Sequence, residues 1–127
     1  MKRARLSVLG SDAVGPYTHA VVSNGLVFCS GQVPLDPNTG KLVEGSIGEQ
    51  TKKCLENLSV VAAAAGAQLS DAVRMGIYVT DMSTFKDVNE AYGSYFESDP
   101  PARSTVGVAA LPLGAQVEID AVIALPD

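Results

Sequence analysis

Two amphipathic helical patterns, each set between strand patterns, constrain the fold of this 127-residue chain more than any other feature. The first pattern starts at 46–49, whose Ser-Ile-Gly-Glu sequence fits a capping box, and continues to Gly66, a residue suited to a helix C-cap. The second covers about 85–96, with Asp81 or Ser83 available as its N-cap. Each helix should act as a right-handed crossover, which makes the strands on either side of it parallel and places the helix on one face of a sheet.

Strand patterns of two kinds surround these helices. Asn24-Gly25 separates two apolar runs and predicts a tight hairpin, because both residues tolerate positive φ. Residues 73–79 alternate apolar and polar side chains, as a half-buried strand does. Strands are therefore expected at about 20–22, 26–29, 73–79, 103–108 and 116–125. We expect the last two strands to pair with each other in antiparallel fashion.

Together these elements predict a single α+β domain over residues 1–127, with a mixed five- to six-stranded sheet and two helices packed on one face. Two helices can cover only one face of such a sheet, so the other face must be polar or covered by a partner. The strands carry apolar residues such as Val106, Val108, Val122 and Ile123, which favour a partner. A homo-oligomer is therefore expected.

Charge and hydropathy argue against several classes of protein. Nine basic and fourteen acidic residues give a net charge of −5, and because Lys2, Arg3 and Arg5 come first, residues 6–127 carry six basic against fourteen acidic residues, a net −8. Such a chain repels nucleic acid, whose binding depends mainly on Lys and Arg. No apolar run approaches the roughly 20 residues of a membrane span, and none follows the basic start as in a signal peptide. We expect no nucleic-acid or membrane partner and a cytoplasmic location.

Sequence motifs for metals and common cofactors are missing from the chain. Cys29 and Cys54 have no metal-ligand spacing and are too few for a disulfide scaffold, and His19 is the single histidine. No dinucleotide-binding glycine motif, P-loop or G-x-S-x-G is present. The sequence therefore gives no support to a metal site, a nucleotide site or a serine hydrolase.

Two of the expected strands carry the side chains best suited to chemistry. Arg103 starts one strand and shares a face with Thr105, and Glu118 and Asp120 share a face of the next strand. The sequence does not fix the register, so it leaves open whether Arg103 faces Glu118 or Asp120. On the residues alone, a cross-strand ion pair on a solvated face is the simplest interpretation.

Smaller signals lie in the first half of the chain. Tyr17 follows Gly15-Pro16 and could place a phenol at a rigid turn, while Ser30-Gly31 at a strand end could offer a hydroxyl and a close backbone approach. Each has a plainer explanation, namely a turn and a strand terminus. Taken singly, none of these residues indicates a function.

Taken in order, these segments resemble the RidA/YjgF family. The similar segments are residues 15–17, 30–34, 37–40, 88–92, 101–106, 111–112 and 117–121. The resemblance extends from about Val14 to Ala124, nearly the whole chain, and its most specific part is Pro-Ala-Arg-Ser at 101–104 followed by Val-Glu-Ile at 117–119.

The resemblance implies a chorismate-mutase-like α+β fold assembled as a homotrimer, with ligand sites at the subunit interfaces. It implies hydrolysis of reactive 2-imino acids to 2-oxo acids and ammonia, with no metal or organic cofactor. A ferredoxin-like split βαβ domain is the alternative fold, since it has the same number of helices. The opening hairpin and the terminal pair of strands fit the chorismate-mutase-like fold better.

The resemblance also implies roles for particular residues. Arg103 matches the family's carboxylate-binding Arg, and a guanidinium binds a planar carboxylate bidentately. Glu118 matches the residue expected to hold and orient the attacking water. Tyr17, Ser30 and Gly31 match positions that line the pocket.

Two further positions belong to this comparison with the family. Thr105 stands where many members have Cys, and its hydroxyl can still form a hydrogen bond to the ligand. Asn89 matches a recurrent family position to which we assign no chemical task.

Other functions stay open at this point. A non-catalytic protein could sense small carboxylic or 2-oxo acids through the same Arg103. Some family members have been linked to RNA cleavage, which the acidic body disfavours. A purely structural or chaperone-like role would leave Arg103 without a task.

Overall fold

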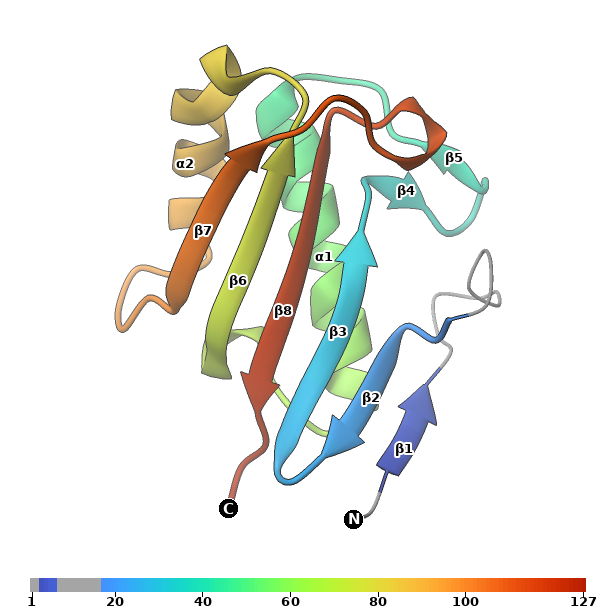
Figure 1. Ribbon diagram of the computed structural model, residues 1–127, viewed down its shortest axis with the longest axis vertical. Helices are drawn as coiled ribbons and strands as arrows, with labels where there is room; N and C mark the ends of the chain where they lie inside the picture. Colours follow the sequence, from blue (N-terminus) through green and yellow to red (C-terminus); the bar gives the residue numbers. More distant parts are fainter. Residues whose placement is uncertain (1–2, 7–16) are drawn as a thin grey trace.

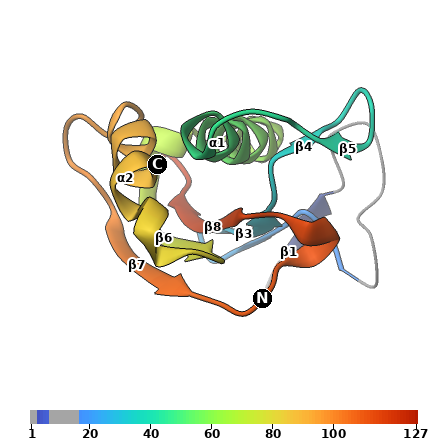
Figure 2. The same ribbon diagram turned by 90° about the horizontal axis from the view of Figure 1, so that it is seen from above.

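The computed structural model of the chain describes residues 3–6 and 17–127, the first of these ranges by its backbone alone. A six-stranded sheet has the order β1-β2-β3-β8-β6-β7, and β4 and β5 form a separate two-stranded ribbon (Figure 1). The strands are β1 Arg3–Leu6, β2 Ala20–Ser23, β3 Leu26–Gln32, β4 Leu35–Asp36, β5 Lys41–Leu42, β6 Ala72–Val79, β7 Ala102–Gly107 and β8 Val117–Ala124. The helices are α1 Ile47–Ala64 and α2 Phe85–Gly93. Both lie on the same side of the six-stranded sheet (Figure 2).

This arrangement confirms the predicted α+β, chorismate-mutase-like fold with a mixed sheet and two helices on one face. The hairpin forms where expected, because Asn24 and Gly25 have φ values of 52° and 77° and join β2 to β3. Helix α1 begins at the predicted cap, where the Ser46 hydroxyl accepts a hydrogen bond of 3.1 Å from the Glu49 amide.

Both helices are crossovers between parallel strands, as expected. Strands β6 and β7 are parallel neighbours on either side of α2. Strands β3 and β6, on either side of α1, are also parallel, because β8 lies between them and is antiparallel to both.

The expected pairing of the last two strands is wrong. Strand β7 pairs with β6 alone, at the edge of the sheet, while β8 enters the middle of the sheet. In that central position β8 buries Val117, Ile119 and Ile123 completely beneath α1. The loop over 108–116 is long enough to pass the end of β6, so burial of these side chains decides the strand order.

The hydrophobic core fills the space between the sheet and the two helices. In β6 the side chains of Met75, Ile77 and Val79 point into it and are fully buried. Val73, expected on the same face, is 47% exposed because the register between β6 and β8 shifts after Ala72. We call the opposite side of the sheet the open face, since no helix of the described residues covers it.

Helix α2 starts where predicted, but its N-cap residue and its C-terminal end differ from the prediction. Asp81 caps a short 3-10 turn instead, accepting a 2.9 Å hydrogen bond from the Ser83 amide, and α2 itself starts at Phe85. The helix ends at Gly93, three residues before the predicted end at about residue 96. None of the described helices is both long and apolar enough to cross a membrane.

Candidate functional site

The two principal candidates, Arg103 and Glu118, lie on opposite faces of the sheet. Arg103 is the register partner of the buried Met75, so its side chain lies on the helix side. Glu118 is the register partner of Tyr78 and, with Asp120, alternates with the buried Val117 and Ile119, so it lies on the open face. The expected cross-strand ion pair is therefore absent among the described residues, and Arg103 shares its face with Thr105 as predicted.

Arg103 lies against the aromatic rings of α2. Its guanidinium carbon is 4.8 Å from the centroid of the Tyr92 ring and 5.7 Å from that of Phe85. Within residues 3–6 and 17–127, no carboxylate lies within ion-pair distance of it. The N–H groups at the edge of this guanidinium are thus free to bind a carboxylate from outside the chain.

Three buried polar atoms on α2 and β7, the elements that carry Arg103 and its two rings, have no hydrogen-bond partner in the described part of the chain. They are Asn89 Oδ1, the Tyr92 hydroxyl and Thr105 Oγ1. Buried polar groups are rarely left unpaired, because the loss of hydration is costly. We call Phe85, Asn89, Tyr92, Arg103 and Thr105 the arginine cluster, and its unpaired atoms indicate a place where a ligand or water completes the hydrogen bonds.

A second group of candidates lies on the open face. The Glu118 carboxylate lies directly over Gly31, where an added Cβ would be 2.7 Å from Glu118 Oε2. Beside it, the Tyr78 hydroxyl donates a 2.9 Å hydrogen bond to Asp120 Oδ2. We call Gly31, Tyr78, Glu118 and Asp120 the carboxylate cluster.

The environment of the carboxylate cluster shifts several pKa values upward. Burial raises the pKa of Glu118, and the nearby charge of Asp120 raises it further, so Glu118 is a stronger base than an ordinary glutamate. The hydrogen bond to Asp120, together with burial, raises the pKa of Tyr78. Burial and Asp120 also raise the pKa of Cys29 to about 11, which leaves that thiol protonated and unreactive at neutral pH.

Ser30 precedes Gly31 of the carboxylate cluster and is hydrogen-bonded to the segment that follows Tyr17. The Ser30 hydroxyl donates a 2.6 Å hydrogen bond to the carbonyl of Thr18, and its amide donates to the carbonyl of His19. Ser30 therefore anchors the segment that carries Tyr17, whose side chain is 49% exposed. The preceding Gly15-Pro16 lies outside the described residues.

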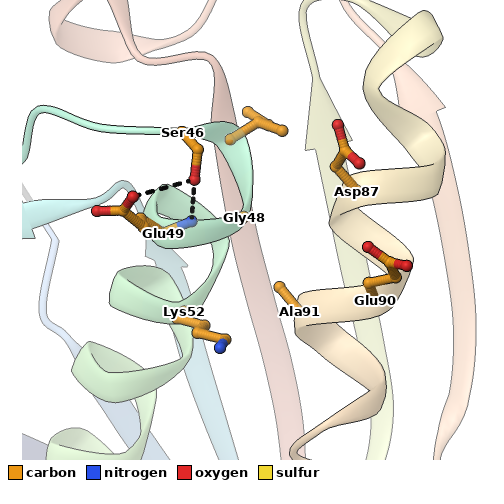
Figure 3. A pocket seen from close by; sticks show the side chains of 8 residues that line it. Ser46, Gly48, Glu49, Lys52, Asp87, Glu90 and Ala91 are labelled. Atoms are coloured by element: carbon orange, nitrogen blue, oxygen red, sulfur yellow. Dashed lines mark hydrogen bonds between the residues drawn. The ribbon is translucent and has the colours of Figure 1, made fainter.

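The surface of the described residues is hollowed between the two helices. This hollow, of about 460 Å³, lies between the start of α1 and α2, with Ser46, Glu49 and Lys52 on one side and Asp87 and Glu90 on the other (Figure 3). It contains none of the predicted site residues.

Another hollow, of about 240 Å³, lies on the open face. Phe28, Arg74, Tyr78 and Asp120 contribute to its lining, so it adjoins the carboxylate cluster. No group of three or more His, Cys, Asp or Glu side chains within the described ranges is arranged to hold a metal ion.

Some residues of these clusters were not predicted from the sequence. Phe85 and Tyr92 have the spacing of a core-facing helix stripe, and only the position of β7 under α2 brings them against Arg103. The sequence does contain a weak indication of where Tyr78 lies. Tyr78 alternates with buried residues along its strand, so its side chain is expected to face away from the helices.

Comparisons with known proteins identify close relatives. Residues 9–125 match the sequence model of a family described as endoribonuclease L-PSP. The human 2-iminobutanoate/2-iminopropanoate deaminase is 41% identical over 122 residues, which cover 96% of this chain and 89% of the human protein.

Solved structures agree with the sequence comparison. A crystal structure of a Thermotoga maritima protein is 43% identical, covers 100% of both chains and superposes with a TM-score of 0.93. The structure of Escherichia coli TdcF with bound serine is 31% identical, covers 97% of this chain and 99% of TdcF, and gives a TM-score of 0.88.

Proposed function

Because the chain belongs to the RidA/YjgF family, which the endoribonuclease L-PSP model describes, we propose that it hydrolyses reactive 2-imino acids to 2-oxo acids and ammonia. The observation that carries this proposal is the free N–H edge of Arg103, a guanidinium with no carboxylate partner in the described chain. A 2-imino acid supplies the planar carboxylate that such an edge binds through two parallel hydrogen bonds.

The chemistry then requires one water molecule and one base. Glu118 takes a proton from the water as its oxygen adds to the imine carbon, and the raised pKa of Glu118 suits this task. The proton is returned to the nitrogen, which gives a carbinolamine. Glu118 then transfers the proton of the new hydroxyl group to the same nitrogen, the C–N bond breaks with its electron pair leaving on nitrogen, and ammonia departs as the C=O bond forms. The products are a 2-oxo acid and ammonia, so atoms and charge balance without a redox step.

A site with both groups requires a second copy of the chain. The sheet separates the Arg103 guanidinium from the Glu118 carboxylate, so one chain does not offer both to a small ligand. We infer a homotrimer in which the β7 edge of one subunit meets the open face of the next. Exposed apolar side chains on that face, Phe28 at 45% and Val106 at 44%, support its burial by another copy.

The proposed pocket then combines both clusters. Arg103 and Thr105 come from one subunit, and Gly31 and Glu118 come from its neighbour. Tyr17 and Ser30 are proposed to line the same pocket, since Ser30 holds the Tyr17 segment beside Gly31. In this arrangement Gly31 lets the ligand approach the backbone next to the Glu118 carboxylate.

A direct assay tests the proposal. An amino-acid oxidase generates 2-iminopropanoate or 2-iminobutanoate in situ, and semicarbazide traps the imine that survives. We expect the protein to lower semicarbazone formation, Arg103→Ala to abolish this effect, and the exposed control Lys52→Ala to retain it. Unchanged activity in Arg103→Ala would overturn the proposal.

The same assay separates catalysis from binding alone. A sensor of 2-oxo acids would bind 2-oxobutanoate through Arg103 without accelerating imine loss.

An RNA-directed activity is disfavoured by the net charge of −5. Retention of RNA at moderate salt would instead support it.

A further inference from the structure

The guanidinium of Arg103 is held by two rings from one face of α2. Phe85 and Tyr92 are seven residues apart, two turns of the helix, so both side chains point toward the same neighbouring strand. The Arg103 guanidinium carbon lies 4.8 Å from the Tyr92 centroid and 5.7 Å from the Phe85 centroid. Both distances are within the range over which a cation is attracted to the face of an aromatic ring.

The ring contacts matter because they involve the flat face of the guanidinium and not its N–H edge. A carboxylate partner within the chain would occupy the N–H edge and cancel the charge of Arg103, which would remove both features that recognise a substrate carboxylate. Aromatic rings contact the flat face of the guanidinium instead. Among the described residues Arg103 has these ring contacts and no ion pair, so its edge stays available and its charge stays uncompensated.

We infer that Phe85 and Tyr92 are positioning residues that orient the Arg103 guanidinium by its face, so that its N–H edge meets the carboxylate of the ligand. This inference rests on the proposed function, because it takes the ligand to be a 2-imino or 2-oxo acid. It assigns the two rings a task in carboxylate recognition, in addition to their part in packing α2 against the sheet.

The two rings differ in how far they belong to the core. Tyr92 is only 5% exposed and packs against Phe96, with 4.7 Å between the ring centroids, so its loss would damage the fold as well as the site. Phe85 is partly buried and is the first residue of α2. Phe85 is therefore the position at which the contact with Arg103 can be removed with the least change to the core.

The test compares Phe85→Leu with Phe85→Tyr, which keeps an aromatic ring. We measure the Kd for 2-oxobutanoate and for its uncharged analogue 2-oxobutanamide, together with KM and kcat for 2-iminobutanoate. In Phe85→Leu we expect the Kd for 2-oxobutanoate and the KM to rise by about 3- to 10-fold, while kcat changes by less than about twofold. The Kd for the amide should not change, and Phe85→Tyr should restore carboxylate binding.

A double-mutant cycle separates this role from a merely structural one. If Phe85 acts through Arg103, then Phe85→Leu should have no further effect on 2-oxobutanoate binding in the Arg103→Ala background. An equal loss for the acid and the amide, or an additive loss in the double variant, would overturn the inference. So would unchanged binding in a folded Phe85→Leu protein.

The binding measurements also keep this inference distinct from the proposed function. If the wild-type protein binds 2-oxobutanoate with the expected dependence on Phe85 but does not accelerate imine loss, the hydrolytic function fails and the positioning role stands. If the wild type hydrolyses imines and Phe85→Leu matches it in every constant, only the positioning role fails. A wild type that does not bind 2-oxobutanoate at all overturns the positioning role.

Discussion

Arg103 and Glu118 lie on opposite faces of one sheet, with strand β6 between the strands that carry them. Arg103 is on the edge strand β7, where its guanidinium contacts α2, and Glu118 is on the central strand β8. A ligand a few ångströms across does not reach both groups on one chain. The proposed chemistry therefore connects the function of this protein to its assembly.

Mixed trimers test this connection. Arg103→Ala and Glu118→Gln should each lose activity by about 100-fold or more, because one lacks the carboxylate anchor and the other the base. When the two variants are unfolded and refolded together, each mixed trimer regains one intact site of its three. Random assortment gives about three quarters mixed trimers, so we expect about a quarter of wild-type activity.

The control for this experiment is the same pair of variants combined without unfolding, which should stay inactive until subunits exchange. Activity of the refolded mixture no higher than that of either variant alone would show that Arg103 and Glu118 act within one chain or not at all. The activity is measured with the semicarbazide trap, after subtraction of the spontaneous loss of imine.

The sequence predicted which face of a strand each side chain occupies better than it predicted which strands are neighbours. Met75, Ile77 and Val79 alternate with polar residues, and that period alone places them in the core. The same period places Glu118 and Ile119 on opposite faces of the sheet, whatever strand lies beside them. Strand order depends instead on which arrangement buries most apolar surface under the helices, and this is a property of the whole chain.

The partners of Arg103 were hidden for the same reason. Its chemical type and its context within Pro-Ala-Arg-Ser predicted a carboxylate anchor, and the structure leaves its N–H edge free for one. The ring contacts depend on β7 lying at the sheet edge beneath α2, a tertiary feature that no local pattern encodes. Local patterns therefore pointed to candidate residues of the site but not to their arrangement in space.

Asn57 is hydrogen-bonded to the segment that follows β3, the strand that carries Ser30 and Gly31. This side chain is 2% exposed, and its amide donates hydrogen bonds of 2.8 Å to the carbonyl of Leu35 and 3.4 Å to that of Val33, just after β3. We expect Asn57→Ala to lower the free energy of unfolding by about 2–3 kcal/mol, because two carbonyls lose their donor and a cavity remains.

The neighbouring Glu56→Ala is the matched control for Asn57→Ala. Glu56 is exposed, and its Oε2 atom lies 3.9 Å from Lys53 Nζ. Glu56→Ala should therefore change the free energy of unfolding by less than about 0.5 kcal/mol. Both values come from urea denaturation followed by circular dichroism. Equal effects of the two substitutions would contradict a structural role for the Asn57 hydrogen bonds.

A side chain at residue 31 should lower activity if the present position of the Glu118 carboxylate is its catalytic position. A Cβ at residue 31 would be 2.7 Å from Glu118 Oε2, so Gly31→Ala displaces the carboxylate. We expect kcat/KM to fall by about 10- to 100-fold, since a displaced base loses its alignment with the water.

Gly93→Ala is the control for this substitution. A Cβ at Gly93, the last residue of α2, meets no atom within 4 Å, so activity should be unchanged. Its stability should rise by up to about 1 kcal/mol, because alanine is the better helix former. Full activity in Gly31→Ala would exclude the observed position of Glu118 from the catalytic arrangement.

The pH dependence of stability follows from the raised pKa of Glu118. Its protonated form is favoured in the folded state, so the stabilisation that Glu118 provides is complete below the ordinary glutamate pKa and is lost as the pH rises through the raised pKa. Glu118→Gln stays neutral and does not lose this contribution. The stability of the variant relative to the wild type should therefore rise as the pH increases from the ordinary glutamate pKa to the raised pKa and stay constant above it, as measured by thermal unfolding across pH.

Asp120→Asn should shift the pH dependence of activity through Glu118. Hydrolysis needs ionised Glu118, so kcat/KM should fall on the acid side around its pKa, which burial and then the Asp120 charge raise above the ordinary value of 4.5. Asp120→Asn removes that charge but can still accept the hydrogen bond from Tyr78, so the midpoint should move to lower pH. Asp87→Asn, an exposed change on α2, should leave it in place. An unmoved midpoint in Asp120→Asn would show that the acid limb does not report Glu118.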